Sequence, residues 1–563
     1  MKLLKKFKVA IIIASIGTVS FTSYSFVDNY FEVSKNLDIF ATLYREVNMY
    51  YVDETKPGEL IQKGIDAMLE SLDPYTNYIS ESDIEDYRYM TTGQYGGVGS
   101  LIRKKGEYVV ITDPYENYPA FKAGLRAGDV ILEVDGKSVK GKETDEISKI
   151  LKGQPGTTLK LLIKREGDKE NIEKSVTREE IKISSVPYHG MLNDEIGYIQ
   201  LTGFTEDAGQ DVKKALVDLK EKNNIKGLVF DLRRNPGGLL NEAVNISNLF
   251  VDRGQEIVNT KGKVKEWEKS YKALNSAVDL QIPIVVLVNS GSASASEIVS
   301  GSLQDLDRAV ILGQRTFGKG LVQTTRNLTY NSKLKVTTAK YYIPSGRCIQ
   351  ALDYSNRNDD GSVGKVPDSL ITKFKTKAGR IVYDGGGIKP DITTEVKRYS
   401  KIVISLDNKM LLFDYATKYR LEHAAIAPAK SFKLSEKEYN DFTEWLGDKE
   451  YDYTTQSEQM MKDLKETASK EKYYANITSE YEALKAKMMH NKKEDLVTFK
   501  DEIKEMLELE IASRYYYQNG RTENSFRFDY EVSKAIELLK DNKKYNSILV
   551  GTYKEEAAVE KKN

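Results

Sequence analysis

The stretch "IPIVVLVNSGSASASEIVSG", residues 282–301, decides how this chain folds. Its first part is a short run of apolar, mostly β-branched residues, which is typical of a buried strand, and its last part has the apolar spacing of a helix. Only Asn, Ser, Gly and Ala stand between the two. Small side chains at such a junction let backbone or ligand approach closely, and the first N–H groups of the helix point at negative charge.

This junction is rich in serine, so it is either a flexible connector or a site where one hydroxyl does chemistry. A serine at the start of a helix can attack a carbonyl carbon while neighbouring amides hold the oxyanion. The pattern does not choose among the serines, which are Ser290, Ser292, Ser294, Ser296 and Ser300.

Strand-like and helix-like segments also alternate on both sides of the junction. Over residues 181–395, strand-like runs such as "IGYIQL", "IKGLVFDL" and "RAVILG" alternate with helical stretches such as "AGQDVKKALVDLKEK". This alternation is the signature of an α/β core. We therefore expect the chemistry to lie in this region.

The regions that flank the core have other patterns. Residues 29–90 carry apolar residues at helical spacing and predict a small helical domain. Residues 93–168 contain short β-like runs between Gly, Asp and Pro signals and predict a compact β-rich module. Residues 396–563 are rich in Lys, Glu and Tyr, contain a capping box at Ser435 and Glu438, and predict a helical domain.

Composition narrows the classes of function. At 563 residues the chain is too long for one core, so several domains are expected. Lys plus Arg equals Asp plus Glu, at 84 each, and no global charge favours nucleic acid as a partner. Cys348 is the only cysteine, which excludes an intrachain disulfide and a thiolate zinc cluster. The 3 histidines show no metal-ligand spacing, so we expect neither a metal nor an organic cofactor.

The amino terminus predicts a location. A cluster of lysines precedes "VAIIIASIGTVSF", an apolar run that is short for a membrane span but suits a secretory signal. We interpret residues 1–25 as a signal peptide that exports the protein to the periplasm or cell envelope. Ser23 and Ser25 could flank a cleavage point, but there is no clean A-x-A, so an uncleaved anchor in the inner membrane is the alternative.

A serine nucleophile needs a base, and no histidine has an obvious place for that role. The strand-like "AVILG" leads into "QRTFGKGLVQ", where Lys319 stands between Gly318 and Gly320 and Gln323 follows. A lysine acts as a general base only if its pKa falls from about 10.4 to roughly 7–8, which costs about 4 kcal/mol. Burial away from carboxylates can do this, and "TFGKGLV" contains no acid. A Ser–Lys dyad is therefore chemically reasonable, with the side-chain oxygen of Gln323 orienting the amine.

A nucleotide site competes for the same residues. Gly313 to Lys319, "GQRTFGK", satisfies G-x-x-x-x-G-K after a strand, and Asp231 could be taken for the acidic residue of a nucleotide-binding fold. However, Gly320 stands where a P-loop needs Ser or Thr for magnesium, and the next element is expected to be a strand rather than a helix. Nucleotide binding is the weaker interpretation.

The motifs together resemble the carboxyl-terminal processing peptidases, or tail-specific proteases, which are PDZ-containing serine peptidases with a Ser–Lys dyad. "GSASASEI" followed by "RAVILGQRTFGKGLVQ" is similar to the family's active-site signature in wording and spacing, and the likeness extends over about residues 44–392. Aligning the family's S-A-S-E element makes Ser294 the nucleophile, and its G-K-G-x-V-Q element falls on Lys319 and Gln323. The resemblance implies a crotonase/Clp-like α/β core with an inserted PDZ module, in a multidomain α+β protein.

The resemblance also implies an oxyanion hole and a peptide site. The hole would use the amides of Ala295 and, in "DLRRNPGG", Gly238. "YGGVG" looks like the carboxylate-binding loop of a PDZ domain over residues 93–168, where the amides of Gly97, Val98 and Gly99 would hold a chain end beside "SLI". Apolar neighbours would favour an apolar terminal residue on the protein or peptide substrate.

The sequence thus predicts an exported serine endopeptidase that recognises protein carboxyl ends and cleaves near them. Self-association is a further implication of the resemblance, which does not cover the tail beyond about Tyr399. The alternative from another class is a non-proteolytic PDZ scaffold or chaperone. The intact set of Ser294, Lys319 and Gln323 argues against it, because a scaffold has no use for all three.

Overall fold

The computed structural model describes residues 30–358, 362–447, 449–488 and 492–553. The segment predicted to be a signal peptide lies outside these ranges. The described residues up to Ser80 form one compact unit with Gln323–Thr337, and Glu81–Val322 forms a second with the described residues from Thr338 onward. Within the described ranges, no helix combines the length and the apolar character needed to cross a membrane.

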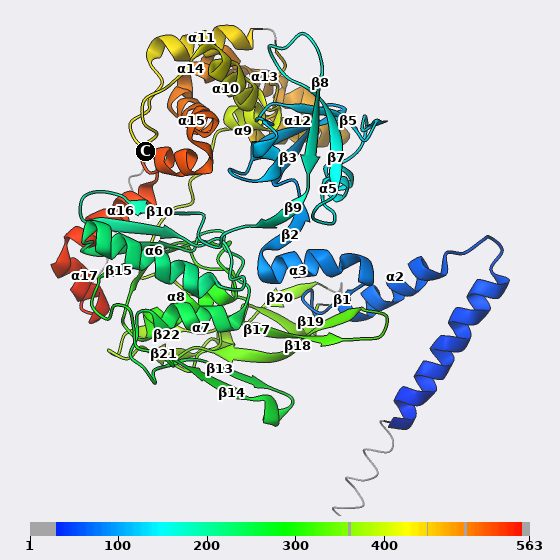
Figure 1. Ribbon diagram of the computed structural model, residues 1–563, viewed down its shortest axis with the longest axis vertical. Helices are drawn as coiled ribbons and strands as arrows, with labels where there is room; N and C mark the ends of the chain where they lie inside the picture. Colours follow the sequence, from blue (N-terminus) through cyan, green and yellow to red (C-terminus); the bar gives the residue numbers. More distant parts are fainter. Residues whose placement is uncertain (1–29, 359–361, 448, 489–491, 554–563) are drawn as a thin grey trace, which may run out of the picture. The chain divides into compact units, whose positions relative to one another are not determined.

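The first unit is small and mostly helical (Figure 1). Residues 30–50 are helical, and α2 spans Pro57–Glu70 with proline in its first turn, where the missing N–H costs nothing. The Asp73 carboxylate then accepts the N–H groups of Tyr75 and Thr76 and forms a turn after the helix. β1, Asn77–Ile79, pairs antiparallel with the first residues of β18, Lys333–Tyr342.

The second unit is built around one mostly parallel sheet. Its strands lie in the order β10, β11, β12, β15, β16 and β23, and only the β10–β11 pair is antiparallel. Their bounds are Tyr188–Met191, Ile196–Gln200, Gly227–Asp231, Ile284–Val288, Val310–Gly313 and Ile392–Thr393. The apolar runs of the sequence became these strands, because both faces of the sheet are covered and each strand can be apolar throughout.

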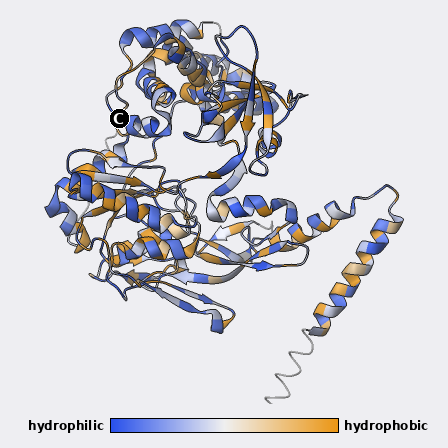
Figure 2. Cartoon of the chain, in the orientation of Figure 1, coloured by the Kyte–Doolittle hydropathy of each residue, from blue (hydrophilic) through white to orange (hydrophobic). Residues whose placement is uncertain are grey.

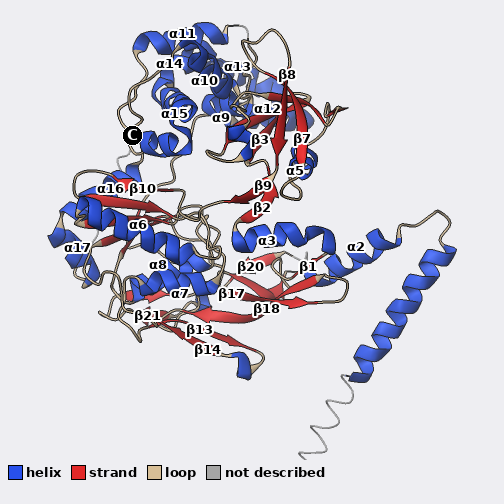
Figure 3. Cartoon of the chain, in the orientation of Figure 1, coloured by secondary structure: helices blue, strands red, loops and turns tan. Residues whose placement is uncertain are grey.

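Helices cover both faces of this sheet (Figure 3). On one face, Phe230 and Val286 pack in the cluster that includes α6, α7 and α8. On the other, Val229 and Val285 pack against α16 and α17. The bounds of these helices are Ala208–Asn223, Leu240–Asn248, Ala295–Asp305, Tyr530–Lys540 and Asn542–Leu549. The last two helices of the chain therefore complete the core, a role that the sequence pattern of the tail did not indicate.

Shorter elements border the sheet of the second unit. β13 pairs antiparallel with β14 and with the end of β18. Their neighbours along the chain are the hairpin strand β17, two small strand pairs, β19 with β20 and β21 with β22, and the 3-10 turns η2 and η3. The bounds are β13 Glu256–Gly262, η2 Lys265–Trp267, β14 Lys269–Lys272, β17 Leu321–Asn327, β19 Leu352–Arg357, β20 Val363–Lys365, η3 Asp368–Leu370, β21 Lys373–Lys375 and β22 Ile381–Tyr383.

The β-rich module is a separate sheet inside the second unit. β3, β4, β5, β7 and β8 follow one another across it, β6 pairs with β5, and β2 pairs with β9 at its base. The bounds are η1 Glu81–Asp83, α3 Ile84–Thr92, β2 Gln94–Gly97, β3 Ser100–Lys105, β4 Tyr108–Pro114, α4 Pro119–Lys122, β5 Val130–Val134, β6 Lys137–Ser138, α5 Thr144–Leu151, β7 Thr158–Lys164, β8 Ile172–Thr177 and β9 Glu179–Lys182. β3 lies at the edge of the sheet and contacts α5.

The tail folds as helices around its own apolar cluster. Figure 2 shows that hydrophobic and hydrophilic residues are interspersed along these helices. Ile503, Leu507 and Ile511, which recur at helical spacing, are all fully buried in that cluster. The expected capping box also forms, because Ser435 and Glu438 bond each other's backbone. The helices are α9 Lys401–Asn408, α10 Leu411–Glu422, α11 Glu436–Leu446, α12 Gln456–Lys470, α13 Tyr474–Met488, α14 Lys492–Thr498 and α15 Lys500–Ser525.

Candidate active site

Ser294 stands at the point where β15 gives way to α8. β15 ends at Val288 and α8 begins at Ala295, so Ser294 is the N-cap residue of the helix. Its backbone angles, φ 55° and ψ −113°, are ones that residues with a side chain rarely adopt. Such a conformation persists only where the surroundings impose it, and active sites are where it is most often found.

The carboxylate of Glu297 imposes this conformation. Its Oε2 accepts the backbone N–H groups of Ser294 and Lys319, both at 2.8 Å. Its Oε1 accepts the Thr316 hydroxyl at 2.5 Å and the Gly318 N–H at 2.8 Å. Glu297 is fully buried. One carboxylate therefore joins the backbone of the serine to the backbone of the lysine.

Burial destabilises the ionised form of Glu297. Burial raises the pKa of Glu297 from 4.5 to about 7, because desolvation disfavours the charged form, and the hydrogen bonds from Thr316, Lys319, Ser294 and Gly318 limit the rise. All of these partners are donors. The ionised carboxylate can accept from every one of them, whereas the protonated acid gives up an acceptor position. The arrangement is therefore complete only when Glu297 is ionised.

Tyr341 provides a second link between the same two residues. Its hydroxyl lies within hydrogen-bond distance of the carbonyl oxygens of Ser294, at 3.1 Å, and of Lys319. The Tyr341 side chain is among the largest that are fully buried. Because Glu297 holds the N–H groups and Tyr341 the carbonyls, the backbones of Ser294 and Lys319 are fixed side by side.

The glycines beside Lys319 are needed for close approach of the backbone. Gly318 has φ +88°, and a Cβ there would lie 2.4 Å from the Cβ of Ala351. A Cβ on Gly320 would lie 2.8 Å from the backbone N of Gln350, whose side-chain oxygen accepts the Gly320 N–H at 2.7 Å. The segment continues as strand β17 and not as a helix, so it lacks the helix amino end on which a P-loop depends.

The "NPGG" loop lies against the serine. Gly237 has φ +97°, and a Cβ there would lie 2.9 Å from both the Cβ of Ser294 and the amide N of Ala295. The Gly237 N–H is used internally, because it donates to the Asn235 side-chain oxygen at 2.9 Å. Within the described residues, the amides of Gly238 and Ala295 donate to no protein acceptor. Two unused donors beside a serine are what an oxyanion hole requires.

Three of the other four serines of the junction have structural partners. The hydroxyl of Ser292 donates to the Leu232 carbonyl at 2.8 Å, that of Ser296 to the Asn235 carbonyl at 2.9 Å, and that of Ser300 to the Ser296 carbonyl at 2.8 Å. All three side chains are fully buried, whereas Ser294 is half-buried.

The predicted site residues fall in both units. Ser294, Ala295, Gly238 and Lys319 all belong to the second unit. The contacts above bring the backbones of Ser294 and Lys319 together and place Gly237, the neighbour of Gly238, against Ser294 and Ala295. Gln323 belongs to the first unit, where its side-chain amide donates to the Thr337 hydroxyl at 3.1 Å. Its role toward Lys319 stays a prediction.

Sequence reasoning missed Glu297, Tyr341 and Asn235 as parts of the site. For Glu297 a signal was present, since Ser294 and Glu297 satisfy the S-x-x-E spacing of a capping box, in which the glutamate bonds the N-cap amide. For Tyr341 there was none, because a tyrosine in a strand has many ordinary uses.

The predicted carboxylate loop lies at the edge of the β-rich module. Gly97 ends β2, and the carbonyls of Val98 and Gly99 accept the N–H groups of Ala120 and Tyr115 at 2.8 and 2.9 Å. Within the described residues, the amides of Val98 and Gly99 donate to no protein acceptor. They precede β3, whose free edge can receive a further strand.

Comparison with protein families assigns each part of the chain. Residues 195–355 match the model of peptidase family S41, residues 110–165 that of a PDZ domain, and residues 402–539 that of the C-terminal helical domain of probable PDZ-proteases. The order and kind of these domains confirm the predicted fold class.

Similar proteins carry the names of peptidases. A carboxy-terminal-processing protease of Bartonella bacilliformis is 39% identical over 321 residues, which cover 56% of this chain and 73% of the relative. A probable CtpA-like serine protease of Staphylococcus aureus is 34% identical over 428 residues, covering 74% of this chain and 82% of the relative. The chain therefore belongs to peptidase family S41. It is an enzyme of the serine peptidase class, as its sequence predicted.

Two solved structures are similar to the chain over part of its length. A photosystem II D1 C-terminal processing protease is 28% identical, with a TM-score of 0.34, over 63% of this chain and 92% of its own. A PDZ domain of a carboxy-terminal protease from Vibrio cholerae, solved with a peptide, is 26% identical, with a TM-score of 0.15, over 16% of this chain and 99% of its own.

Proposed function

We propose that this peptidase binds the carboxyl ends of proteins on its PDZ module and cleaves them by a Ser–Lys dyad. Ser294 attacks the scissile carbonyl, and Lys319 takes the proton and later gives it to the leaving amine. The amides of Ala295 and Gly238 stabilise the tetrahedral oxyanion. One observation carries the proposal: Glu297 and Tyr341 hold the backbones of Ser294 and Lys319 together, beside two unused amides.

The conformation of Ser294 supports its role as nucleophile. A residue at φ 55° and ψ −113° costs about 1–3 kcal/mol, which a purely structural N-cap would not need. The hydroxyls of Ser292, Ser296 and Ser300 donate to carbonyl oxygens, and Ser290 lies in the exposed turn after β15, which supports Ser294 as the serine that serves the reaction.

Capture of a carboxyl end is supported by the loop before β3. The amides of Val98 and Gly99 are unused, and Leu101 on the edge strand exposes 47% of its surface. A terminal carboxylate on these amides would let the last residues of a substrate add to β3 as a strand, with apolar side chains preferred.

The test uses the full chain without nucleotide or metal. A quenched fluorescent peptide with an apolar carboxyl end should be cut by the wild type and not by Ser294→Ala. A fluorophosphonate reagent should label Ser294, as peptide mass spectrometry would show. Peptide binding without cleavage by the wild type would instead support the scaffold or chaperone alternative.

We further propose that the protein is exported, on the evidence of the lysine cluster and apolar run in residues 1–25. Fractionation of cells that express the full chain should place it in the envelope, and removal of residues 1–25 should leave it in the cytoplasm. Sequencing the amino terminus of the envelope form would distinguish a cleaved signal from an uncleaved anchor.

Self-association is also part of the proposal. The helix over residues 30–50 exposes most of its apolar side chains, including Phe31 at 68%, Leu37 at 63% and Leu43 at 57%. A soluble helix does not usually leave its apolar face in water. Sedimentation of the wild type and of a variant with Leu37→Glu and Leu43→Glu should show loss of the oligomer in the variant.

A further inference from the structure

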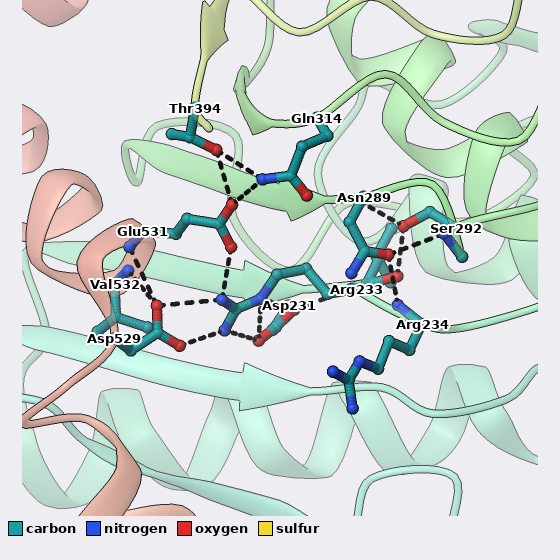
Figure 4. A network of polar contacts seen from close by, with 12 residues as sticks. Asp231, Arg233, Arg234, Asn289, Ser292, Gln314, Thr394, Asp529, Glu531 and Val532 are labelled. Atoms are coloured by element: carbon teal, nitrogen blue, oxygen red, sulfur yellow. Dashed lines mark hydrogen bonds and ion pairs between the residues drawn. The ribbon is translucent and has the colours of Figure 1, made fainter. Parts of the chain in front are cut away.

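Arg233 lies at the start of the loop that ends in the oxyanion-hole glycines. It follows the last residue of β12, Asp231, by two positions and precedes Gly238 by five. Figure 4 shows its guanidinium group surrounded by three carboxylates. The shortest contacts are 2.6 Å to Asp231, 2.7 Å to Asp529 and 2.7 Å to Glu531.

Two of these carboxylates come from the far end of the chain. Asp529 is the N-cap of α16 and accepts the N–H groups of Glu531 and Val532, each at 3.0 Å. α16 in turn packs on the core sheet through Val532 and Ala535, both fully buried. Arg233 therefore connects the loop of the active site to α16. This helix follows the whole helical domain in the sequence and packs on the core sheet.

Glu531 connects the same helix to the lysine segment. Its Oε2 binds Arg233, and its Oε1 accepts the Thr394 hydroxyl at 2.7 Å and the side-chain amide of Gln314. Gln314 follows β16 directly and stands five residues before Lys319. A single side chain from the tail thus contacts both segments that lead into the site.

The loop of Arg233 is also bonded to the segment of the nucleophile. The N–H of Arg234 donates to the side-chain oxygen of Asn289 at 2.9 Å, and the hydroxyl of Ser292 donates to the carbonyl of Leu232 at 2.8 Å (Figure 4). Arg234 has φ 59°, so the loop is held in a strained turn directly after Arg233. A shift of Arg233 would be transmitted to the serine junction and to Gly238.

Two of the three carboxylates that pair with Arg233 stand at the start of α16, so these two ion pairs require that α16 is docked on the core. Asp231 and Arg233 alone are a neutral pair, whereas Asp529 and Glu531 bring two further negative charges that Arg233 must hold. The Arg233 side chain is 18% exposed, and a cavity of about 1440 Å³ borders it. Loss of the guanidinium would leave these carboxylates repelling one another in a poorly solvated place.

We propose that Arg233 is a positioning residue, held by Asp529 and Glu531, and that the oxyanion-hole loop reaches its active geometry only when α16 is docked on the core. The inference rests on the proposed Ser–Lys mechanism. It assigns the tail a part in catalysis that its sequence did not suggest. The residues do not touch substrate, so their effect must appear through the geometry of the loop.

The experiment compares Arg233→Met and Glu531→Gln in the full chain with the wild type. Reaction with a fluorophosphonate first counts the active Ser294 in each preparation, so that kcat refers to folded sites only. We expect kcat per titrated site to fall about tenfold to a hundredfold in both variants, because an oxyanion donor is misplaced and not lost, while KM stays within twofold. Arg233→Lys should recover part of kcat, because it keeps the charge but not the bidentate geometry.

A transition-state analogue separates geometry from stability. A peptide boronic acid, whose boronate oxygen occupies the oxyanion position, should bind the variants more weakly by the factor lost in kcat, whereas binding of an uncleaved carboxyl-terminal peptide should not change. Arg165→Met is the matched control, because the Arg165 side chain is 14% exposed and pairs with Asp129 at 2.7 Å in the β-rich module, on elements other than α16 and the active-site segments.

The outcomes distinguish a positioning role of Arg233 from a purely structural one. If kcat per site of Glu531→Gln equals that of the wild type, or if Arg165→Met lowers it as much as Arg233→Met, the positioning role is wrong. If Arg233→Met does not fold, Glu531→Gln still decides, since it preserves the shape of the side chain. A wild type that is inactive, or as slow as Ser294→Ala, would instead refute the proposed function and not this inference.

Discussion

In the proposed function the peptidase site and the PDZ loop both offer backbone N–H groups to an oxygen of a carboxyl-derived group, but the fold holds them by different means. The site is fixed by a buried charged side chain, Glu297, and by a buried hydroxyl, Tyr341. The PDZ loop is fixed by backbone bonds from Ala120 and Tyr115 and by burial of the Val98 side chain in the core of the module.

This difference follows from the proposed tasks of the peptidase site and the PDZ loop. An oxyanion exists only in the transition state, and its donors help only if they are in position beforehand. A terminal carboxylate is a stable group, so a loop that adapts by a few tenths of an ångström can still bind it. We therefore expect single changes to cost much more at the site than at the PDZ loop.

The largest expected effect tests the dyad itself. Lys319→Ala should lower kcat by about 10⁴-fold or more, because members of a nucleophile–base pair act as a unit. A fluorescent apolar peptide should bind the variant as it binds the wild type, by polarisation. If cleavage continued at a tenth of the normal rate, another residue would have to be the base.

The next effect tests how Glu297 holds the site. In Glu297→Gln an amide NH₂ would face at least one of the donors that the carboxylate now accepts, so the backbones of Ser294 and Lys319 should separate. We expect kcat to fall about 10²–10³-fold and the free energy of unfolding by about 1–3 kcal/mol. Steady-state kinetics and urea unfolding measure the two.

A suitable control for Glu297→Gln is Glu531→Gln, which makes the same change at the edge of the core and should cost less in kcat. Equal losses in the two variants would mean that Glu297 is no more than a distant support of the loop.

The PDZ loop should respond more weakly. Gly99 has φ +72°, and a Cβ there would lie 2.6 Å from the Cβ of Tyr118, so Gly99→Ala should displace the amides that precede β3. We expect about a tenfold loss in peptide affinity. Cleavage of a peptide with an amidated carboxyl end, which cannot use this loop, serves as the control and should not change. An effect on both peptides alike would show that the two regions are not separate.

The smallest effect is the dependence on pH. With the pKa of Glu297 raised to about 7, the ionised carboxylate and hence kcat should increase by up to about tenfold from pH 6 to pH 8. Stability should move in the opposite direction. Between the unfolded value of 4.5 and the folded value of about 7, the folded state holds the proton more tightly, so the free energy of unfolding should decrease as pH rises.

Urea unfolding of the wild type and Glu297→Gln at several pH values checks the sign. The total change across this window should be about 3 kcal/mol in the wild type and absent from the variant. A wild type whose stability rises with pH over the same window would mean that the donors around Glu297 outweigh its burial.

Much of this molecule follows from local pattern. The run 284–288 is typical of a buried strand, the small residues after it suit a close junction, and the capping box at Ser435 and Glu438 predicts the start of a helix. Periodicity and side-chain volume are properties of neighbours along the chain, and they were enough for the domain classes and for a short set of candidate residues.

Contacts between residues far apart in the sequence decided which side chains meet at the site and around Arg233. No pattern indicates that Tyr341 would hold Ser294 and Lys319 together, or that Asp529 and Glu531 would reach Arg233 across nearly 300 positions, as their separations of 296 and 298 residues show. Such partners are chosen by where packed helices and strands end in space. Because burial makes an unpaired charge costly, only the folded chain determines which carboxylate meets which cation.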